Sequence, residues 1–245
     1  MVRVKLVVAY DGTDYCGWQI QNNGITIEEV LNRELSSLLG EEIRVIGASR
    51  TDSGVHALGN VAVFDTESRI PPDKISFALN QRIPEDIRIV DSCQVADDFH
   101  PRYCNTIKTY EYKIWNDRFP NPLVRRYSKF TYFDIDIDKM EEGAKYLIGE
   151  HDFKSFCSSK TQVESTVRTI TDITFSKADN MITMRISGTG FLYNMVRIIM
   201  GTLLQCGMGM IEPSYVGDIL AAKDRSKAGP TEEAKGLTLV KIEYL

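Results

Sequence analysis

The sequence predicts an α+β fold made of two ferredoxin-like halves, each with the element order β-α-β-β-α-β. Short runs with period-two alternation and segments with helical periodicity follow one another in this order twice along the chain. The chain has 245 residues, of which 43% are hydrophobic, and this is enough for a substantial core. Such halves carry antiparallel sheets with helices packed on one face of each.

The first half begins with an amphipathic strand at residues 2–10. A helix is predicted from Thr26 to Leu39, because Thr26 and Glu29 form a capping box and apolar residues recur along one stripe. The remaining predicted elements of this half are strands near 43–48 and 60–65, a helix near 73–80 and a strand near 86–93.

The second half repeats the order. Asp138 as N-cap and Glu141 as its capping-box partner predict the start of its first helix. Its predicted elements are a strand near 107–115, a helix near 139–148, strands near 167–176 and 181–187, a helix near 191–206 and a strand near 237–244. We place the boundary so that the halves are 1–104 and 105–245. No low-complexity linker separates them, so we expect the halves to pack tightly around a cleft.

Residues 47–60 are the candidate site, because they form a long polar segment between two predicted strands. Arg50 and Asp52 stand at its centre, and three glycines accompany them. Strands on both sides make a rigid mount for a reactive group. An ordinary hairpin connection is the simpler interpretation, but hairpin loops are rarely this long, and long ordered loops tend to be functional.

The net charge of −5 taken alone disfavours nucleic acid as a partner, since phosphate binding needs a cationic surface. The distribution of charge changes this conclusion. Residues 100–131 contain seven basic and two acidic residues, with aromatic residues among them. Basic and aromatic side chains together can hold a phosphate backbone and stack on bases. The alternative is a solvated charged face over ordinary core aromatics.

Several other classes are disfavoured. The N-terminus alternates like a strand rather than resembling a signal peptide, and the longest uncharged run, residues 198–211, is too short to cross a bilayer. The five cysteines and three histidines are scattered without metal-ligand spacing. We therefore expect a cytoplasmic protein with no membrane association, disulfide framework, metal or cofactor.

The segment Arg50-Thr51-Asp52-Ser53-Gly54-Val55-His56-Ala57 closely resembles the signature of the tRNA pseudouridine synthase A (TruA) family. Ser49 departs from it, because the family usually has glycine there, and a positive φ would disfavour serine. Further stretches similar to family motifs are Tyr10-Asp11-Gly12-Thr13, Gly17-Trp18-Gln19, Thr109-Tyr110-Glu111-Tyr112, Phe191-Leu192-Tyr193-Asn194-Met195-Val196-Arg197, Leu220-Ala221-Ala222-Lys223-Asp224-Arg225 and Gly236-Leu237. The resemblance therefore spans both halves.

The resemblance implies that Asp52 is the catalytic nucleophile, that Arg50 fills the space left by a flipped base and holds phosphate, and that Tyr110 is the active-site tyrosine. The implied substrate is the anticodon stem-loop of tRNA, with uridines at positions 38 to 40 converted to pseudouridine by a homodimer. A single carboxylate suits this isomerisation, whereas glycoside hydrolysis normally requires two. The resemblance implies neither a metal nor a cofactor.

Arg197 and Tyr110 can also be assessed without the resemblance. Arg197 lies in an otherwise apolar helix and shares a face with Tyr193 and Gly201, where the small glycine allows another element to approach. A guanidinium in such a setting needs a carboxylate, and we expect Arg197 to pair with Asp52. The alternative is a solvent-facing arginine. Tyr110 suits stacking on a flipped uracil, or it is an ordinary core tyrosine.

Two other functions remain open from the residues alone. A non-catalytic RNA-binding protein of duplicated ferredoxin-like domains would explain the basic and aromatic run, and replacing Asp52 would leave its function intact. An aspartate-dependent hydrolase acting on a small phosphate or sugar would explain Asp52, and it would release phosphate or free base. Neither explains both the loop and the basic segment.

Overall fold

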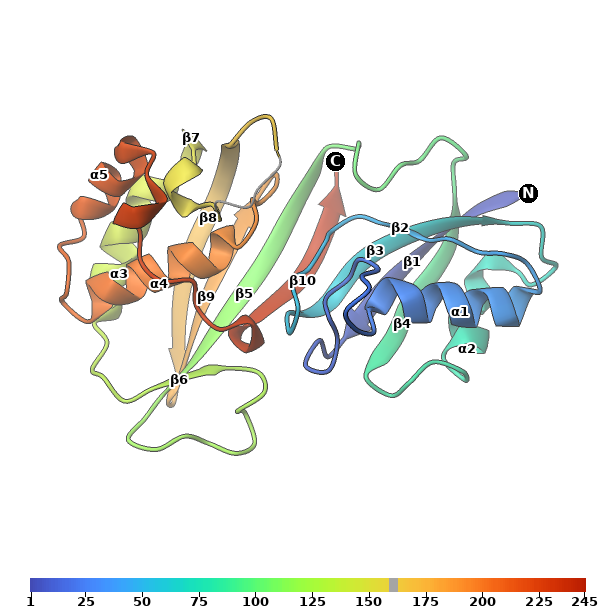
Figure 1. Cartoon of the computed structure of the whole chain (residues 1–245), viewed down its shortest axis with the longest axis horizontal. Coiled ribbons are helices and arrows are strands. Elements are labelled where there is room, and N and C mark those ends of the chain that lie inside the picture. The colour runs from blue at the N-terminus through green and yellow to red at the C-terminus, as the bar shows by residue number, and fades with distance from the viewer. Residues whose placement is uncertain (159–162) are drawn as a thin grey trace. The chain divides into compact units, whose positions relative to one another are not determined.

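The computed structural model describes residues 1–158 and 163–245 of the chain (Figure 1), which fall into two compact units. Unit 1 comprises Met1–Asn105 and Thr238–Leu245, and unit 2 comprises Thr106–Leu237. The last strand of the chain is thus grouped with the N-terminal residues.

Unit 1 is built around a sheet in which β1 lies between β3 and β4 and pairs antiparallel with both. On the other side of β3, the strand β10 runs parallel to it, and β2 pairs antiparallel with β3 as well. The elements of unit 1 are β1 (Val2–Tyr10), α1 (Ile27–Leu39), β2 (Ile46–Gly47), β3 (His56–Thr66), the 3-10 helix η1 (Pro72–Lys74), α2 (Ile75–Leu79), β4 (Ile87–Val95) and β10 (Leu237–Tyr244).

The core of unit 1 forms between this sheet and its helices. Every second residue of β1 from Val4 to Tyr10 is buried, as period-two alternation requires. Helix α1 buries Ile27, Val30, Leu31 and Leu35 and contacts α2. The Thr26 side chain accepts a hydrogen bond from the Glu29 backbone N–H, so the predicted N-terminus of this helix is confirmed.

The candidate loop is shorter than predicted at both ends. The predicted strand near 43–48 reduces to Ile46–Gly47, because side chains of α1 satisfy the preceding backbone: Ser36 Oγ accepts from Ile43 N–H and Asn32 Oδ1 from Val45 N–H. Strand β3 begins at His56 instead of near residue 60, since His56 is in register with Thr238 of β10. The loop therefore comprises residues 48–55.

In unit 2, the strands β5, β9, β8 and β7 pair antiparallel in this order, and β6 pairs parallel with β5. Helices α3, α4 and α5 gather on one side of it (Figure 1). The elements of unit 2 are β5 (Thr106–Asn116), β6 (Lys129–Thr131), α3 (Ile137–Ala144), η2 (Lys145–Leu147), β7 (Gly149–Asp152), η3 (Lys154–Phe156), β8 (Val167–Ala178), β9 (Met181–Gly188), α4 (Met195–Gly207), α5 (Tyr215–Ala222), η4 (Arg225–Lys227) and η5 (Ala234–Gly236).

Two helix starts in unit 2 differ from the prediction. Asp136, not Asp138, is the N-cap of α3, and its side chain accepts from the Lys139 N–H at 3.2 Å. Its extended backbone is held in place by a hydrogen bond from its N–H to Gly207 O. Helix α4 begins at Met195 instead of near 191, because Asn194 takes a left-handed conformation (φ 61°) that a helix cannot include. Helix α5 and the short strands β6 and β7 were not predicted.

The mixed α+β class is confirmed: over residues 1–158 and 163–245 the structure has five α-helices, and its strands pair mostly antiparallel. None of the helices in these residues has the length and apolar character needed to cross a membrane.

Candidate active site

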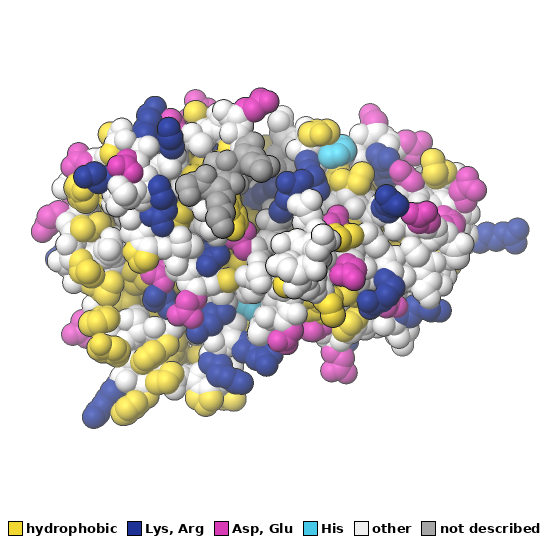
Figure 2. Space-filling model, viewed as in Figure 1, with side chains coloured by type: hydrophobic (Ala, Val, Ile, Leu, Met, Phe, Trp, Pro, Cys, Tyr) yellow, Lys and Arg dark blue, Asp and Glu magenta, His cyan; other side chains and the backbone are white. Residues whose placement is uncertain are grey.

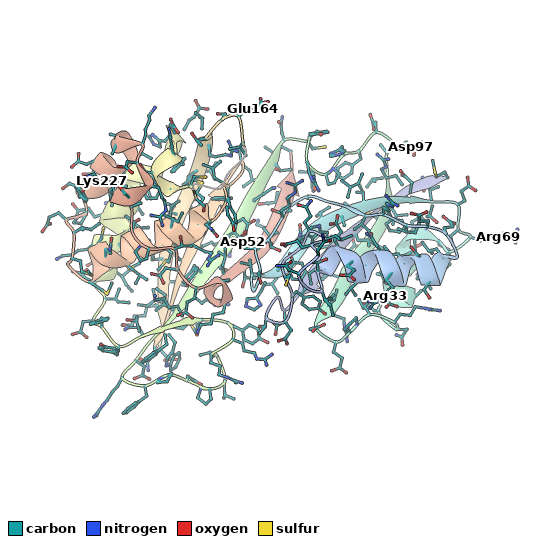
Figure 3. The ribbon with its side chains drawn as sticks, in the orientation of Figure 1. Arg33, Asp52, Arg69, Asp97, Glu164 and Lys227 are labelled. Atoms are coloured by element: carbon teal, nitrogen blue, oxygen red, sulfur yellow. The ribbon has the colours of Figure 1, made fainter. Side chains whose placement is uncertain are left out.

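Asp52 lies half-buried on the loop 48–55, between β2 and β3 of unit 1 (Figure 3). Its neighbour Thr51 is buried, whereas Arg50 and Ser53 are exposed. The Asp52 backbone oxygen accepts a hydrogen bond from the Val55 N–H, which closes a tight turn. The loop thus points polar side chains outward from a main chain that is fixed from within.

A buried polar network supports this loop from below. The hydroxyl groups of Tyr10 and Thr51 lie 2.7 Å apart in a hydrogen bond. The amide nitrogen of Asn60 donates to Tyr10 Oη at 3.2 Å and to the Ser49 carbonyl at 3.0 Å. Asn60 is fully buried on β3, where its neighbours are apolar. These bonds tie Ser49 and Thr51, the two neighbours of Arg50, to the strands β1 and β3, and Thr51 directly precedes Asp52.

The segment after β1 covers the same loop from another direction. The Trp18 backbone N–H donates to the Thr51 carbonyl at 3.1 Å, and the Gly54 backbone N–H donates to the Tyr15 carbonyl at 3.3 Å. Gly17 has φ +85°, and a Cβ there would lie 2.5 Å from the Thr51 carbonyl oxygen. No other residue fits this position without moving the loop, so Gly17 allows the close approach of two main chains.

His56 begins β3 and takes part in the same packing. It is buried, and its Nδ1 accepts a hydrogen bond from the Gly12 N–H at 3.1 Å. The Asp11 carboxylate lies 3.1 Å from the same nitrogen. In the part of the chain that the structure describes, no three His, Cys, Asp or Glu side chains form a group able to hold a metal ion. Through its hydrogen bond with Gly12, His56 joins the covering segment to the start of β3.

Tyr110 and Arg197 belong to unit 2, whereas Arg50 and Asp52 belong to unit 1. Tyr110 lies on β5 opposite Ile186 of β9 and is only 7% exposed. Its ring meets the ring of Phe191 edge-on, with centroids 5.2 Å apart. This contact fixes the orientation of the tyrosine ring and leaves a small part of it accessible.

Arg197 is half-buried in the first turn of α4 and is held by oxygen atoms of its own unit. Its Nε donates to the Glu232 carbonyl at 2.6 Å and its Nη1 to the side chain of Asn194 at 2.9 Å. A Cβ at Gly201 would lie 2.1 Å from the Pro230 carbonyl oxygen, so another element does approach at this glycine, as predicted. The approaching segment is the one that carries Glu232.

Glu232 is a buried residue that the sequence did not single out. It is 5% exposed, and its carboxylate pairs with Lys129 of β6. The neighbouring Glu233 carbonyl accepts a hydrogen bond from the Tyr112 hydroxyl at 2.8 Å, and burial raises the pKa of Tyr112 well above its usual value. These contacts fix the segment 229–236 against β5 and β6, and through it they fix Arg197.

Four aromatic residues of the segment 106–131 fall into a buried and an exposed pair, while Trp115 and Phe130 are half-buried. Tyr110 and Tyr112 are core residues of β5, whereas Phe119 and Tyr127 are exposed on the connection between β5 and β6. Figure 2 shows hydrophobic and basic side chains together over this connection, at the lower left. The exposed basic residues there are Arg118, Arg125 and Arg126. Tyr110 and Tyr112 of β5 are therefore core aromatic residues, as one of the two interpretations expects. The connection between β5 and β6 carries an exposed basic and aromatic surface.

A family model described as tRNA pseudouridine synthase matches residues 6–104 and 144–245, which is most of the chain. The chain belongs to the tRNA pseudouridine synthase family. Proteins named tRNA pseudouridine synthase A are 48% identical in Thermoanaerobacter sp. (strain X514), 46% in Acetivibrio thermocellus and 45% in Brevibacillus brevis. Each of these alignments covers 100% of both chains.

One aligned solved structure, titled "Crystal structure of the archaeal box H/ACA sRNP Nop10-Cbf5 complex", covers 96% of this chain and 45% of its own. Its identity of 10% and TM-score of 0.38 are too low to support an inference.

Ser49, which departs from the family's usual glycine, and Asn194, which lies in the motif before Arg197, both have structural accounts. Ser49 has no positive φ and is buried, so the loop does not require glycine at this position. Asn194 takes the left-handed conformation at the start of α4, which asparagine tolerates better than most residues. Its side chain also accepts the hydrogen bond from Arg197. Asn194 thus both starts α4 and holds the Arg197 side chain.

Sequence reasoning missed Tyr10 and Asn60 as supports of the loop, and Glu232 as a support of Arg197. One signal was available: Asn60 is a polar residue that directly precedes the apolar run 61–64 of a predicted strand. A buried amide requires partners, and here the partner is the loop that carries Asp52. Glu232 gave no comparable signal.

Proposed function

We propose that this chain isomerises uridine to pseudouridine in the anticodon stem-loop of tRNA, at positions 38 to 40, with Asp52 as the nucleophile. The observation that carries the proposal is family membership over the full length of the chain. The loop 48–55 supports it, because Asp52 is partly accessible on a main chain fixed by buried hydrogen bonds. A preorganised nucleophile of this kind lowers the cost of reaching the transition state.

The net chemistry exchanges the C1′–N1 bond for a C1′–C5 bond. Asp52 attacks ribose C1′ as the bond between C1′ and uracil N1 breaks, and the detached base turns over in the site. C5 then bonds to C1′ as the bond between Asp52 and C1′ breaks, C5 loses its hydrogen as a proton, and N1 takes up a proton. Because the base never leaves, no second carboxylate is needed to protonate a departing group.

Three further residues have proposed roles. Arg50 is exposed beside Asp52 and suits the space left by the flipped uridine and its phosphate. Tyr110 stacks on the flipped uracil, supported by the ring contact that orients it. Arg197 pairs with Asp52 and keeps it ionised; its anchoring to the Glu232 carbonyl supports a fixed position for its guanidinium. None of these roles calls for a metal or a cofactor.

We also infer that the halves 1–104 and 105–245 follow the ferredoxin-like plan. The order β1-α1-β2-β3-α2-β4 and the pairing β4-β1-β3-β2 in unit 1 support this. A cytoplasmic homodimer is the proposed form. The exposed apolar side chains of Phe119 and Leu123 are of the kind that mark interfaces, and light scattering of the purified protein tests the dimer.

The direct test of the activity is product analysis. Unmodified tRNA is incubated with the protein, digested to nucleosides and separated chromatographically. We expect pseudouridine to appear as uridine disappears, with no uracil or phosphate released. Primer extension after carbodiimide labelling locates the product, and we expect it at positions 38 to 40. Release of uracil or phosphate would indicate a hydrolase, and unchanged tRNA would leave only a binding function.

A further inference from the structure

Arg102 reaches the base of the candidate loop from another part of unit 1. It lies in the segment 96–105 that follows β4, and its Nε donates to the Gly47 carbonyl at 2.6 Å. Gly47 is the last residue of β2, directly before the loop 48–55. The guanidinium of Arg102 is therefore held beside the loop that carries Arg50 and Asp52.

Arg102 and Arg50 form a pair of like charges. The pKa of Arg102 is lowered first by its burial and then by the positive charge of Arg50, while Glu28 has a weaker opposite effect. Within residues 1–158 and 163–245, the two Nη atoms of Arg102 and the whole guanidinium of Arg50 donate no hydrogen bond to protein. Two neighbouring guanidinium groups with unused donors favour an anionic ligand, and guanidinium geometry suits phosphate.

An aromatic surface adjoins this pair. Tyr103 is 84% exposed, and its ring stacks on that of His100 with centroids 4.0 Å apart and an interplanar angle of 15°. His100 is itself fixed, because its Nδ1 accepts the Arg102 N–H at 3.2 Å. One face of an exposed tyrosine is thus supported by a second ring while the rest of it is open to solvent. Such a surface suits the face of a nucleic-acid base.

We propose that Arg102 and Tyr103 form a nucleotide subsite for the substrate RNA, in which Arg102 and Arg50 bind a phosphodiester and Tyr103 stacks on a base. The proposal rests on the proposed function and extends it to residues next to the catalytic loop. Phosphate and base are bound by adjacent residues of one fixed segment, so the subsite holds RNA by its backbone and by any base, independently of sequence.

The salt dependence of tRNA binding tests the phosphate contact. Affinity for labelled tRNA is measured by fluorescence anisotropy over a range of salt concentrations for wild type, Arg102→Ala and Arg102→Lys. We expect Arg102→Ala to bind roughly tenfold more weakly and to reduce the slope of log affinity against log salt by about one. Arg102→Lys should keep the slope. Arg33→Ala is the matched control, since Arg33 pairs with Glu34 on the exposed face of α1 (Figure 3).

A purely structural role of Arg102 predicts a different result. If the residue only holds the Gly47 carbonyl, Arg102→Ala should lower the melting temperature and the rate at saturating tRNA, with an unchanged salt slope. Arg102→Lys would then not restore function. That set of results, or wild-type affinity in Arg102→Ala, would overturn the phosphate contact.

Substitution of Tyr103 tests the stacking contact. We expect Tyr103→Ala to weaken tRNA binding on the order of tenfold and Tyr103→Phe to leave it unchanged. Equal binding by all three proteins would overturn the stacking contact. Pseudouridine formation by the wild type is measured in parallel. If pseudouridine formation is absent while the variants still bind tRNA more weakly than the wild type, the proposed function fails and the subsite stands. If pseudouridine forms and the variants bind tRNA like the wild type, the subsite fails.

Discussion

The residues around Asp52 and those around Arg197 are held in place in different ways. In unit 1, the loop 48–55 is fixed through its main chain by hydrogen bonds to Trp18, Tyr15 and Asn60. In unit 2, Arg197 lies in the first turn of the helix α4, and its side chain donates a hydrogen bond to the Glu232 carbonyl. The comparison teaches that a loop such as 48–55 is fixed through several backbone hydrogen bonds, whereas a side chain on a helix is oriented by the segment packed against it.

The largest expected effect is at Gly17, where unit 1 brings two main chains together. We predict that Gly17→Ala lowers the free energy of unfolding by roughly 3 kcal/mol or more, because the new Cβ would lie 2.5 Å from the Thr51 carbonyl oxygen. Gly40→Ala is the matched control: Gly40 has φ +71° but open space around it, so only about 1 kcal/mol of backbone strain is expected. Urea unfolding measures both. Equal losses would show that the contact with the loop is unimportant.

Gly201 offers the corresponding test in unit 2. A Cβ there would lie 2.1 Å from the Pro230 carbonyl oxygen and would displace the segment that orients Arg197. We predict that Gly201→Ala costs about 1–3 kcal/mol of stability and lowers the rate of pseudouridine formation. The loss of rate is separated from the loss of stability by measuring single-turnover kinetics under conditions where the variant is folded. A normal rate in the folded variant would mean that this segment does not position Arg197.

A smaller effect is expected from the buried network below the loop. Tyr10→Phe removes the hydroxyl that joins Thr51 and Asn60, and we predict a loss of about 0.5–1.5 kcal/mol in stability together with a lower rate at saturating tRNA. A double-mutant cycle with Thr51→Val measures the coupling of the two hydroxyl groups. Additive losses would contradict a direct link between β1 and the loop.

The smallest predicted effect is the pH dependence contributed by one carboxylate in each unit. Hydrogen bonding from Arg3 lowers the pKa of Asp65, and hydrogen bonding from Thr166 and Lys223 lowers that of Asp152. Because the folded-state pKa values are depressed, this stability is present above about pH 4 and is lost as the pH falls further. Asp65→Asn and Asp152→Asn should each flatten the acid side of a stability profile measured by urea unfolding. An unchanged profile in either variant would contradict the corresponding contact.

The sequence was most informative where periodicity decides the structure. The capping box at Thr26 and the stripe of α1 led to the correct helix, because local bonds and burial specify it together. The sequence was less informative where contacts with segments far along the chain determine the structure. β3 begins at His56 because a strand from the far end of the chain pairs there, and no local pattern around residue 56 records that partner.

The same distinction applies to the candidate site. The motif from Arg50 to Ala57 led directly to the family, whereas the supports of the loop come from β1 and from the middle of β3. Arg102 lies far along the chain from Gly47, so the hydrogen bond between them could not be predicted from spacing. Residue type indicated the chemistry, and tertiary contacts determine its geometry.

The most direct test of the central claim is tritium release from tRNA labelled at C5 of uridine, with wild type compared with Asp52→Ala. Formation of the C1′–C5 bond expels that hydrogen, so its release reports the isomerisation itself. Asp91→Asn, an exposed carboxylate on β4, is the matched control. We predict release by the wild type and the control and none by Asp52→Ala, with tRNA binding retained in all three. Release by Asp52→Ala at the wild-type rate would contradict the assignment of Asp52 as the nucleophile.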